Sequence, residues 1–101
     1  MPILEPHRIA VTLVHSPACH FCDDASVALA ELATTQPIDV TTVGLESDEG
    51  AALVARHRPA MNPLVLVDGE FFSSGRLPRK KLLRLLSRRA DAAAAYQAGV
   101  S

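Results

Sequence analysis

The feature that most constrains the fold is an apolar strand that leads directly into an amphipathic helix. Residues 8–15, RIAVTLVH, form a nearly unbroken apolar run rich in β-branched residues, which is typical of a central strand covered on both faces. After a short loop, SPAC, apolar residues recur at helical spacing, and Pro37 ends the helix. The predicted buried side of this helix comprises Cys22, Ala25, Leu29, Leu32 and Ala33. A strand of this kind needs apolar cover on both sides, so the chain is predicted to form a layered α/β domain.

The rest of the chain completes the element order β-α-β-α-β-β-α. Strands are predicted over 8–15, 38–45, 64–67 and 70–72, and helices over 22–33, 47–58 and 78–90. Ser47 is a candidate N-cap, and Asp68-Gly69 is a strong signal for a hairpin turn. The first β-α-β unit predicts parallel strands with a right-handed crossover, and the hairpin adds an antiparallel edge. We therefore expect a four-stranded mixed sheet with helices on both faces.

The length and charge of the chain limit the kinds of protein that it can be. The 101 residues are predicted to form a single domain, 1–101, in which residues from about 91 to 101 form a fraying helix or a loose tail. The formal net charge of -1 predicts no general attraction to nucleic acid or to a membrane surface. The N-terminus has no signal-peptide pattern, and no apolar run approaches the roughly 20 residues of a membrane span, so a cytoplasmic protein is expected.

Both cysteines lie in the segment HSPACHFCDD. Cys19 comes at the carboxyl end of the first strand, where the first helix begins, and reaction sites in α/β sheets gather at such strand ends. A C-x-x-C sequence beside a β-α-β pattern is typical of a redox-active dithiol. The N–H groups of Phe21 and Cys22 at the helix N-terminus are expected to stabilise a Cys19 thiolate. A protonated His20 would add to this stabilisation, and Asp23 would oppose it.

Three segments together resemble the thioredoxin-fold superfamily and, within it, the glutaredoxin-like family. They are SPACHFC after the first strand, MNPLVLVDG as the proline-plus-strand segment and SSGRL before the last helix, and the resemblance covers roughly residues 8–90. The C-x-x-C-D-x-A arrangement is most similar to small bacterial glutaredoxin-like proteins. The resemblance implies a thioredoxin-like fold and a thiol–disulfide oxidoreductase, in which Cys19 attacks a substrate disulfide and Cys22 resolves the mixed disulfide.

The resemblance also implies roles for residues around the two cysteines. His20 and Phe21 are expected to tune the redox potential. The residues expected to bind substrate are Asn62, Pro63, Gly75 and Arg76. Asn62 offers its backbone to the substrate and precedes Pro63 in a cis peptide bond. The partner would be a disulfide-containing protein or a small-thiol compound. Glutathione, another low-molecular-weight thiol or a thioredoxin reductase would supply electrons, and neither a tightly bound cofactor nor a metal is implied.

Two other uses of the same residues stay open. A thioredoxin fold can serve as a non-catalytic binding module, and glutaredoxin-like proteins can bridge an iron–sulfur cluster together with a small thiol. A zinc site is disfavoured, because the four candidate ligands lie within eight residues and no second ligand pair has zinc-finger spacing. These candidate ligands are His15, Cys19, His20 and Cys22.

Basic residues are concentrated in one segment late in the sequence, with no acidic residue among them. Seven of the ten lysines and arginines lie there: Arg76, Arg79, Lys80, Lys81, Arg84, Arg88 and Arg89. One interpretation is a solvated helix face with favourable charge at the C-terminal end of the helix. The other is an electrostatic docking site for an acidic partner or a thiol carboxylate, with Arg76 as the best candidate.

Overall fold

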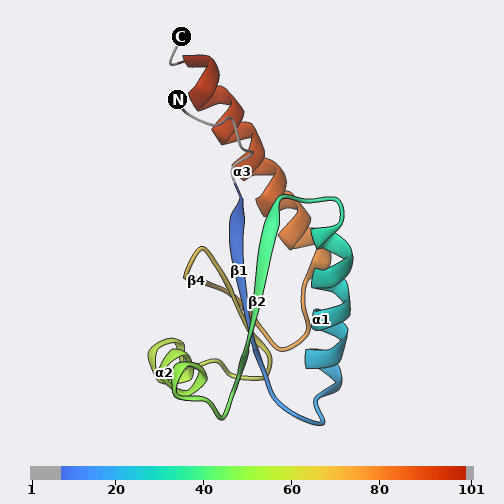
Figure 1. The fold of residues 1–101 in the computed structure, drawn as a ribbon, viewed down its shortest axis with the longest axis vertical. Helices are drawn as coiled ribbons and strands as arrows, with labels where there is room; N and C mark the ends of the chain where they lie inside the picture. The colour runs from blue at the N-terminus through green and yellow to red at the C-terminus, as the bar shows by residue number, and fades with distance from the viewer. Residues whose placement is uncertain (1–7, 100–101) are drawn as a thin grey trace.

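The computed structural model describes the backbone of residues 8–99 and the side chains of residues 8–89 and 91. It contains the seven predicted elements in the predicted order (Figure 1). They are β1 (Ile9–His15), α1 (His20–Ala33), β2 (Ile38–Gly44), α2 (Asp48–His57), β3 (Leu64–Val67), β4 (Glu70–Ser74) and α3 (Arg79–Gly99). The strand boundaries differ from the predicted ones by two residues or fewer, because each strand is delimited by turn residues that act locally.

The four strands form one mixed sheet in the order β2-β1-β3-β4. β1 runs parallel to β2, with Val11 opposite Val40, and antiparallel to β3, with Leu13 opposite Val65. β4 returns antiparallel to β3 through the Asp68-Gly69 turn. This is the thioredoxin-like α/β architecture that the sequence predicts.

Helices cover both faces of the sheet, as predicted (Figure 1). On one face, α1 and α3 pack against β1 and β3 and form the larger core, in which Leu13, Leu29 and Leu82 are fully buried. On the other face, α2 packs its partly buried Leu53 against a smaller cluster that includes Leu64. Because both faces are covered, every residue of β3 is buried.

The buried side of α1 differs from the predicted one at two positions. Cys22, Ala25 and Leu29 are buried and Leu32 is partly buried, as predicted, but Ala33 is exposed and Ala28 is buried instead. Ala28 lies three residues from Ala25 and beside Leu29, so it belongs to the same helix stripe.

The helix α3 is longer than predicted. The sequence predicts a helix over 78–90 and, from about residue 91, either a fraying helix or a loose tail. The backbone continues as a helix to Gly99, and residues 100–101 lie outside the described residues. The alanine-rich sequence after residue 90 explains the extension, because alanine is the strongest helix former. The interpretation of the basic segment as favourable charge at a helix C-terminus is therefore wrong. Arg76 precedes α3, the other six basic residues fall between Arg79 and Arg89, and the last turn of the helix contains no basic residue.

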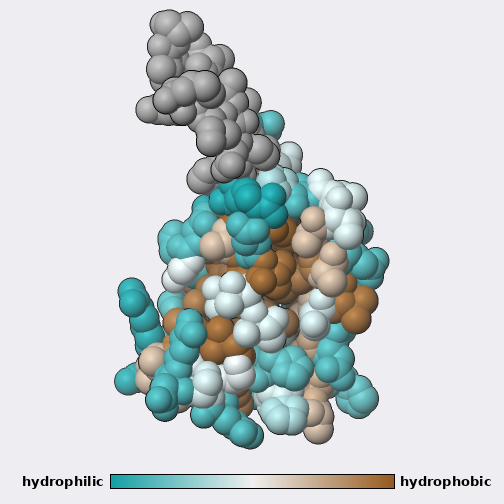
Figure 2. All heavy atoms as spheres, in the orientation of Figure 1, coloured by the Kyte–Doolittle hydropathy of each residue, from teal (hydrophilic) through white to brown (hydrophobic). Residues whose placement is uncertain are grey.

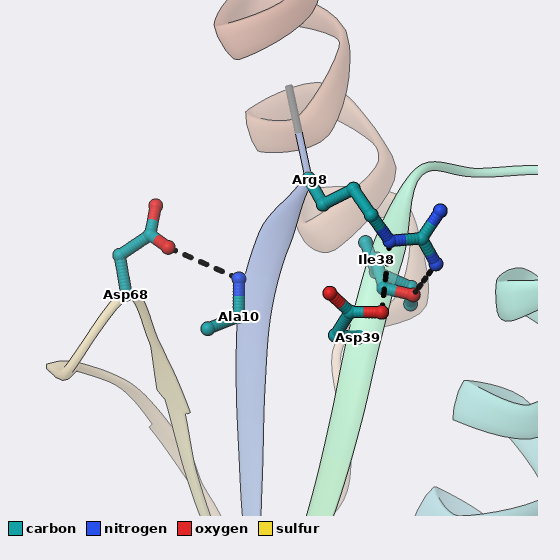
Figure 3. A network of polar contacts seen from close by, with 5 residues as sticks. All are labelled: Arg8, Ala10, Ile38, Asp39 and Asp68. Carbon is teal, nitrogen blue, oxygen red and sulfur yellow. Dashed lines mark hydrogen bonds and ion pairs between the residues drawn. The ribbon is translucent and has the colours of Figure 1, made fainter. Parts of the chain in front are cut away.

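Polar contacts hold the start of β1 to both of its neighbours (Figure 3). On one side, Arg8 donates to the Asp39 carboxylate at 2.8 Å and to the Ile38 carbonyl oxygen at 3.1 Å. On the other side, the Asp68 carboxylate in the β3–β4 turn accepts from the Ala10 N–H at 3.0 Å. The strand is thus tied across the sheet in both directions, in addition to its ladder hydrogen bonds.

The surface shown in Figure 2 is mixed in character. Apolar side chains come to the surface in the middle of this face, and hydrophilic side chains surround them. Within residues 8–99, none of the helices combines the length and the apolar content that a membrane span requires.

Gly50, in the first turn of α2, is a close-packing point of the fold. The Ser47 side chain caps this helix, as predicted, by accepting from the Gly50 N–H at 3.0 Å. A Cβ on Gly50 would overlap the carbonyl oxygen of Gly44 and lie 3.1 Å from the Leu45 Cα, both of which are backbone atoms. A side chain at this position therefore requires the backbone to move.

We predict that Gly50→Ala lowers the free energy of unfolding by about 1–3 kcal/mol, as overpacking does in other proteins. This cost exceeds the roughly 1 kcal/mol that alanine gains over glycine in a helix. Urea unfolding measures the difference. Gly44→Ala is the matched control and is expected to leave stability nearly unchanged, because a Cβ there meets no atom within 4 Å. Equal effects of the two substitutions would contradict the prediction.

Candidate functional site

Cys19 occupies the N-cap position of α1. Its backbone is extended, with φ -119° and ψ 110°, and its Sγ accepts a hydrogen bond from the Cys22 N–H at 3.1 Å. Among the described hydrogen bonds, the expected second donor, the Phe21 N–H, does not reach this sulfur. The Cys19 side chain is partly exposed. Its sulfur therefore lies at a helix N-terminus, where the helix dipole and a backbone donor favour a negative charge, and it can be reached from water.

Ala18 turns the chain from the strand into the helix. Its φ of 53° lies in the left-handed region, which residues with a Cβ seldom adopt. Strained backbone of this kind persists only where the surrounding structure enforces it. Here it lies between the end of β1 and the N-cap residue Cys19.

Cys22, one turn into α1, has the opposite environment. It is fully buried, with 0% exposure. Burial, chiefly, and a hydrogen bond with Cys19 raise the pKa of the Cys22 thiol to about 11, against a lowering contribution from the Ser16 backbone. The nearby negative charges of Cys19 and Asp23 raise it further. The helix thus presents one thiol to solvent and keeps the other protonated behind it.

A histidine–carboxylate pair lies at the N-terminus of α1. The His15 Nε2 at the end of β1 is 3.6 Å from the Asp23 Oδ1 in the first turn of the helix. The sequence indicated only that Asp23 would oppose a charge on Cys19. In the structure a protonated His15 would form an ion pair with this carboxylate and offset part of its charge. Such a pairing has no local sequence signal, because it depends on how the strand and the helix meet.

The loop before β3 lies at the same end of the sheet as the C-x-x-C segment. Leu64 pairs with Val14 of β1 and with Ser74 of β4. Pro63 and Gly75 come just outside these pairs. They therefore stand beside the end of β1, from which the chain continues into the C-x-x-C segment.

The residues that are predicted to bind substrate lie around this loop. The Asn62–Pro63 peptide bond is cis, as the resemblance implies, with Asn62 exposed and Pro63 buried. The Gly75 N–H donates to the Pro63 carbonyl oxygen at 3.0 Å. Gly75 has a φ of +82°, and a Cβ on it would lie 3.3 Å from the Met61 Sδ. Asn62, Pro63 and Gly75 are thus brought together, and Arg76 follows them as an exposed side chain.

The two residues between the cysteines, His20 and Phe21, are both exposed. Phe21 is 39% exposed, and Met61 beside the Asn62–Pro63 bond is 53% exposed. The surface around the exposed thiol therefore includes large apolar side chains that a partner could cover.

A hollow of about 500 Å³ opens between α1 and the start of α3. It is lined by Asp24, Arg76, Leu77, Pro78, Arg79, Lys80, Lys81 and Arg84. Asp24 contacts the Arg79 guanidinium at 3.0 Å. The sequence pointed to Arg76 but gave no signal for Asp24, because the Asp24–Arg79 pair joins residues 55 positions apart.

Comparisons with known proteins do not assign a family. A scan against protein-family models and a search of the curated proteins both found no match. Among the residues that the structure describes, no three His, Cys, Asp or Glu side chains form a group that could hold a metal ion. The resemblance to the glutaredoxin-like family thus remains a hypothesis that depends on the sequence motifs.

We predict a loss of stability at alkaline pH that depends on Cys22. The unfolded thiol ionises near its ordinary pKa of 9.0, and the folded thiol ionises only at about 11. The stabilisation from the protonated form is therefore fully present below pH 9.0 and is lost as the pH rises to about 11. The full loss is on the order of 3 kcal/mol, since the two pKa values differ by about two units and each unit is worth about 1.4 kcal/mol.

Denaturant unfolding of the reduced protein at pH 7, 9 and 11 measures this loss. Cys22→Ala is the control, because it retains Cys19 and all other titrating groups. The wild-type protein is expected to lose more stability than this variant over the alkaline range. Parallel pH profiles would show that the Cys22 thiol ionises as it does in the unfolded chain.

Proposed function

We propose that this chain is a dithiol–disulfide oxidoreductase of the glutaredoxin-like type within the thioredoxin-fold superfamily. The observation that carries the proposal is the contrast between its two thiols. Cys19 is partly exposed at the helix N-terminus and accepts a backbone hydrogen bond, whereas Cys22 is buried one turn behind it with a raised pKa. Thiol–disulfide exchange needs an accessible thiolate that attacks and a second thiol that acts later.

The reaction begins with attack of the Cys19 thiolate on one sulfur of a substrate disulfide. A bond forms between Cys19 and that sulfur, the substrate S–S bond breaks, and the other substrate sulfur leaves as a thiolate. Cys22 then loses its proton and attacks the Cys19 sulfur, which releases the second substrate thiolate and leaves a Cys19–Cys22 disulfide. The substrate gains two electrons, and an external thiol reductant returns them to the protein.

The raised pKa of Cys22 is compatible with this order of events. Two of its causes, the hydrogen bond with Cys19 and the Cys19 charge, depend on a reduced Cys19. Both disappear when Cys19 enters the mixed disulfide, so the pKa of Cys22 falls at the stage at which it must ionise. Burial, the largest cause, remains until the partner or water reaches the site.

The edge formed by Asn62, Pro63 and Gly75 supports a role in substrate binding. An extended substrate segment would pair with the exposed Asn62 backbone in the manner of an added β-strand. Phe21 would cover apolar surface of the substrate, and His20 would affect the charge beside Cys19. Each of these contacts acts close to the attacking sulfur.

The electron donor in this proposal is glutathione, another low-molecular-weight thiol or a thioredoxin reductase, with no tightly bound cofactor. A cytoplasmic location is part of the proposal, because that compartment keeps such dithiols reduced. Failure of the wild-type protein to reduce any model disulfide would favour the alternative of a non-catalytic binding module.

We predict that Cys22→Ser accumulates a mixed disulfide with its substrate, because the resolving thiol is missing. Incubation with a fluorescent peptide disulfide, followed by mass spectrometry without reductant, would reveal the adduct on Cys19. Cys19→Ser is the matched variant and is expected to form no adduct, since the remaining thiol is buried. Equal labelling of the two variants would refute the assigned order of the cysteines.

A further inference from the structure

The hollow between α1 and α3 is surrounded by positive charge. Five of its eight lining residues are cationic: Arg76, Arg79, Lys80, Lys81 and Arg84. All five side chains are exposed. The only carboxylate among the lining residues is Asp24. The hollow therefore has a strong local excess of positive charge on a chain whose net charge is only -1.

This charge does not serve the stability of α3. Arg79, Lys80 and Lys81 lie in its first turn, where the helix dipole disfavours cations, and this turn contains no acidic residue. Lys80 and Arg84 are like charges four residues apart, which is also unfavourable. The helices α1 and α2 follow the usual rule, with acidic residues in their first turns. A role outside the fold would explain why α3 does not.

Two of the five cations already have partners. Arg79 pairs with Asp24, and the Lys81 Nζ lies 5.5 Å from the centre of the Phe72 ring. Within the part of the chain that the structure describes, Arg76, Lys80 and Arg84 form no ion pair. These three side chains are therefore available to an external anion.

Two of the residues that line the hollow, Asp24 and Arg76, are close in sequence to residues of the proposed dithiol site. Asp24 follows the resolving cysteine by two residues on α1, and Figure 1 shows α1 and α3 on the same face of the sheet. Arg76 directly follows Gly75, whose N–H is bonded to Pro63. A substrate segment that pairs with the edge formed by Asn62, Pro63 and Gly75 could thus continue into the hollow.

We infer that this hollow docks an acidic segment of a protein disulfide substrate, through the carboxylates of that segment. The inference rests on the proposed function, because it concerns the substrate of that site. A segment with several carboxylates fits better than a single small anion. The hollow measures about 500 Å³, and Lys80 and Arg84 are separated by about 6 Å along the helix. Several carboxylates along one segment can pair with more of these exposed cations at the same time than a single small anion can.

The first test measures binding without chemistry. Cys19→Ser protein is titrated into a fluorescein-labelled peptide of glutamate and glycine, and into the same peptide with glutamine for glutamate, and anisotropy is recorded. The acidic peptide is expected to bind at least about tenfold tighter at low salt, and salt should weaken this preference because the cations are exposed. The triple variant Arg76→Gln, Lys80→Gln, Arg84→Gln is expected to lose it.

A matched control removes three other exposed cations that do not line the hollow, through Arg56→Gln, Arg58→Gln and Arg88→Gln. This variant is expected to keep the preference for the acidic peptide. Equal binding of both peptides, or an equal loss in the control variant, would overturn the docking site. If a single-stranded oligonucleotide of the same charge bound more tightly than the acidic peptide, an acidic protein segment would be the wrong occupant for the hollow.

The second test uses the same two peptides, each joined through a disulfide to a fluorescent thiol, with wild-type protein and dithiothreitol. The acidic substrate is expected to show the higher kcat/KM, and the triple variant to remove the difference. Reduction of both peptides at equal rates would overturn the docking site but not the proposed function. Binding of the acidic peptide with no reduction of either substrate would instead overturn the oxidoreductase.

Discussion

The central position of β1 is the constraint on which the rest of the structure depends. This strand forms ladder hydrogen bonds with β2 on one side and β3 on the other, and it has buried side chains on both faces. Leu13 belongs to the core under α1 and α3, and Val14 to the core under α2. A slip of one residue would exchange these faces, so the register is strongly specified. The position at which β1 ends, and with it the start of the C-x-x-C segment, follows from this register.

Helix geometry explains why two cysteines three residues apart can differ so strongly. Cys19 lies at the N-cap, outside the first turn, where the Cys22 N–H donates to its sulfur. Cys22 lies in the first turn on the stripe that also carries Ala25 and Leu29, and this stripe faces the sheet. The environment of each thiol is therefore a consequence of how α1 docks on β1 and β3. The partial exposure of the first thiol and the burial of the second come from the same packing.

The helix α3 combines a stabilising face with a destabilising N-terminus. Leu82 and Leu86 are buried against the sheet, and burial of a leucine contributes about 1.5–3 kcal/mol. A charge of the wrong sign at a helix end costs about 0.3–1 kcal/mol. The apolar face can therefore offset several unfavourable cations. This balance allows the first turn of α3 to carry a positive surface beside the dithiol without loss of the helix.

The sequence by itself determined the seven elements, their order, the Ser47 cap and the Asp68-Gly69 turn, because periodicity, capping and turn signals act over a few residues. It also indicated that Cys19 would lie at the N-terminus of the first helix. The sequence left open whether the chain after residue 90 is helical, since no glycine or proline in its alanine-rich continuation marks a helix end before Gly99. Only the tertiary structure decided that Asp23 meets His15 and that a basic hollow opens beside Asp24. Those features depend on contacts between side chains of different elements, and such contacts are set by how the helices pack on the sheet.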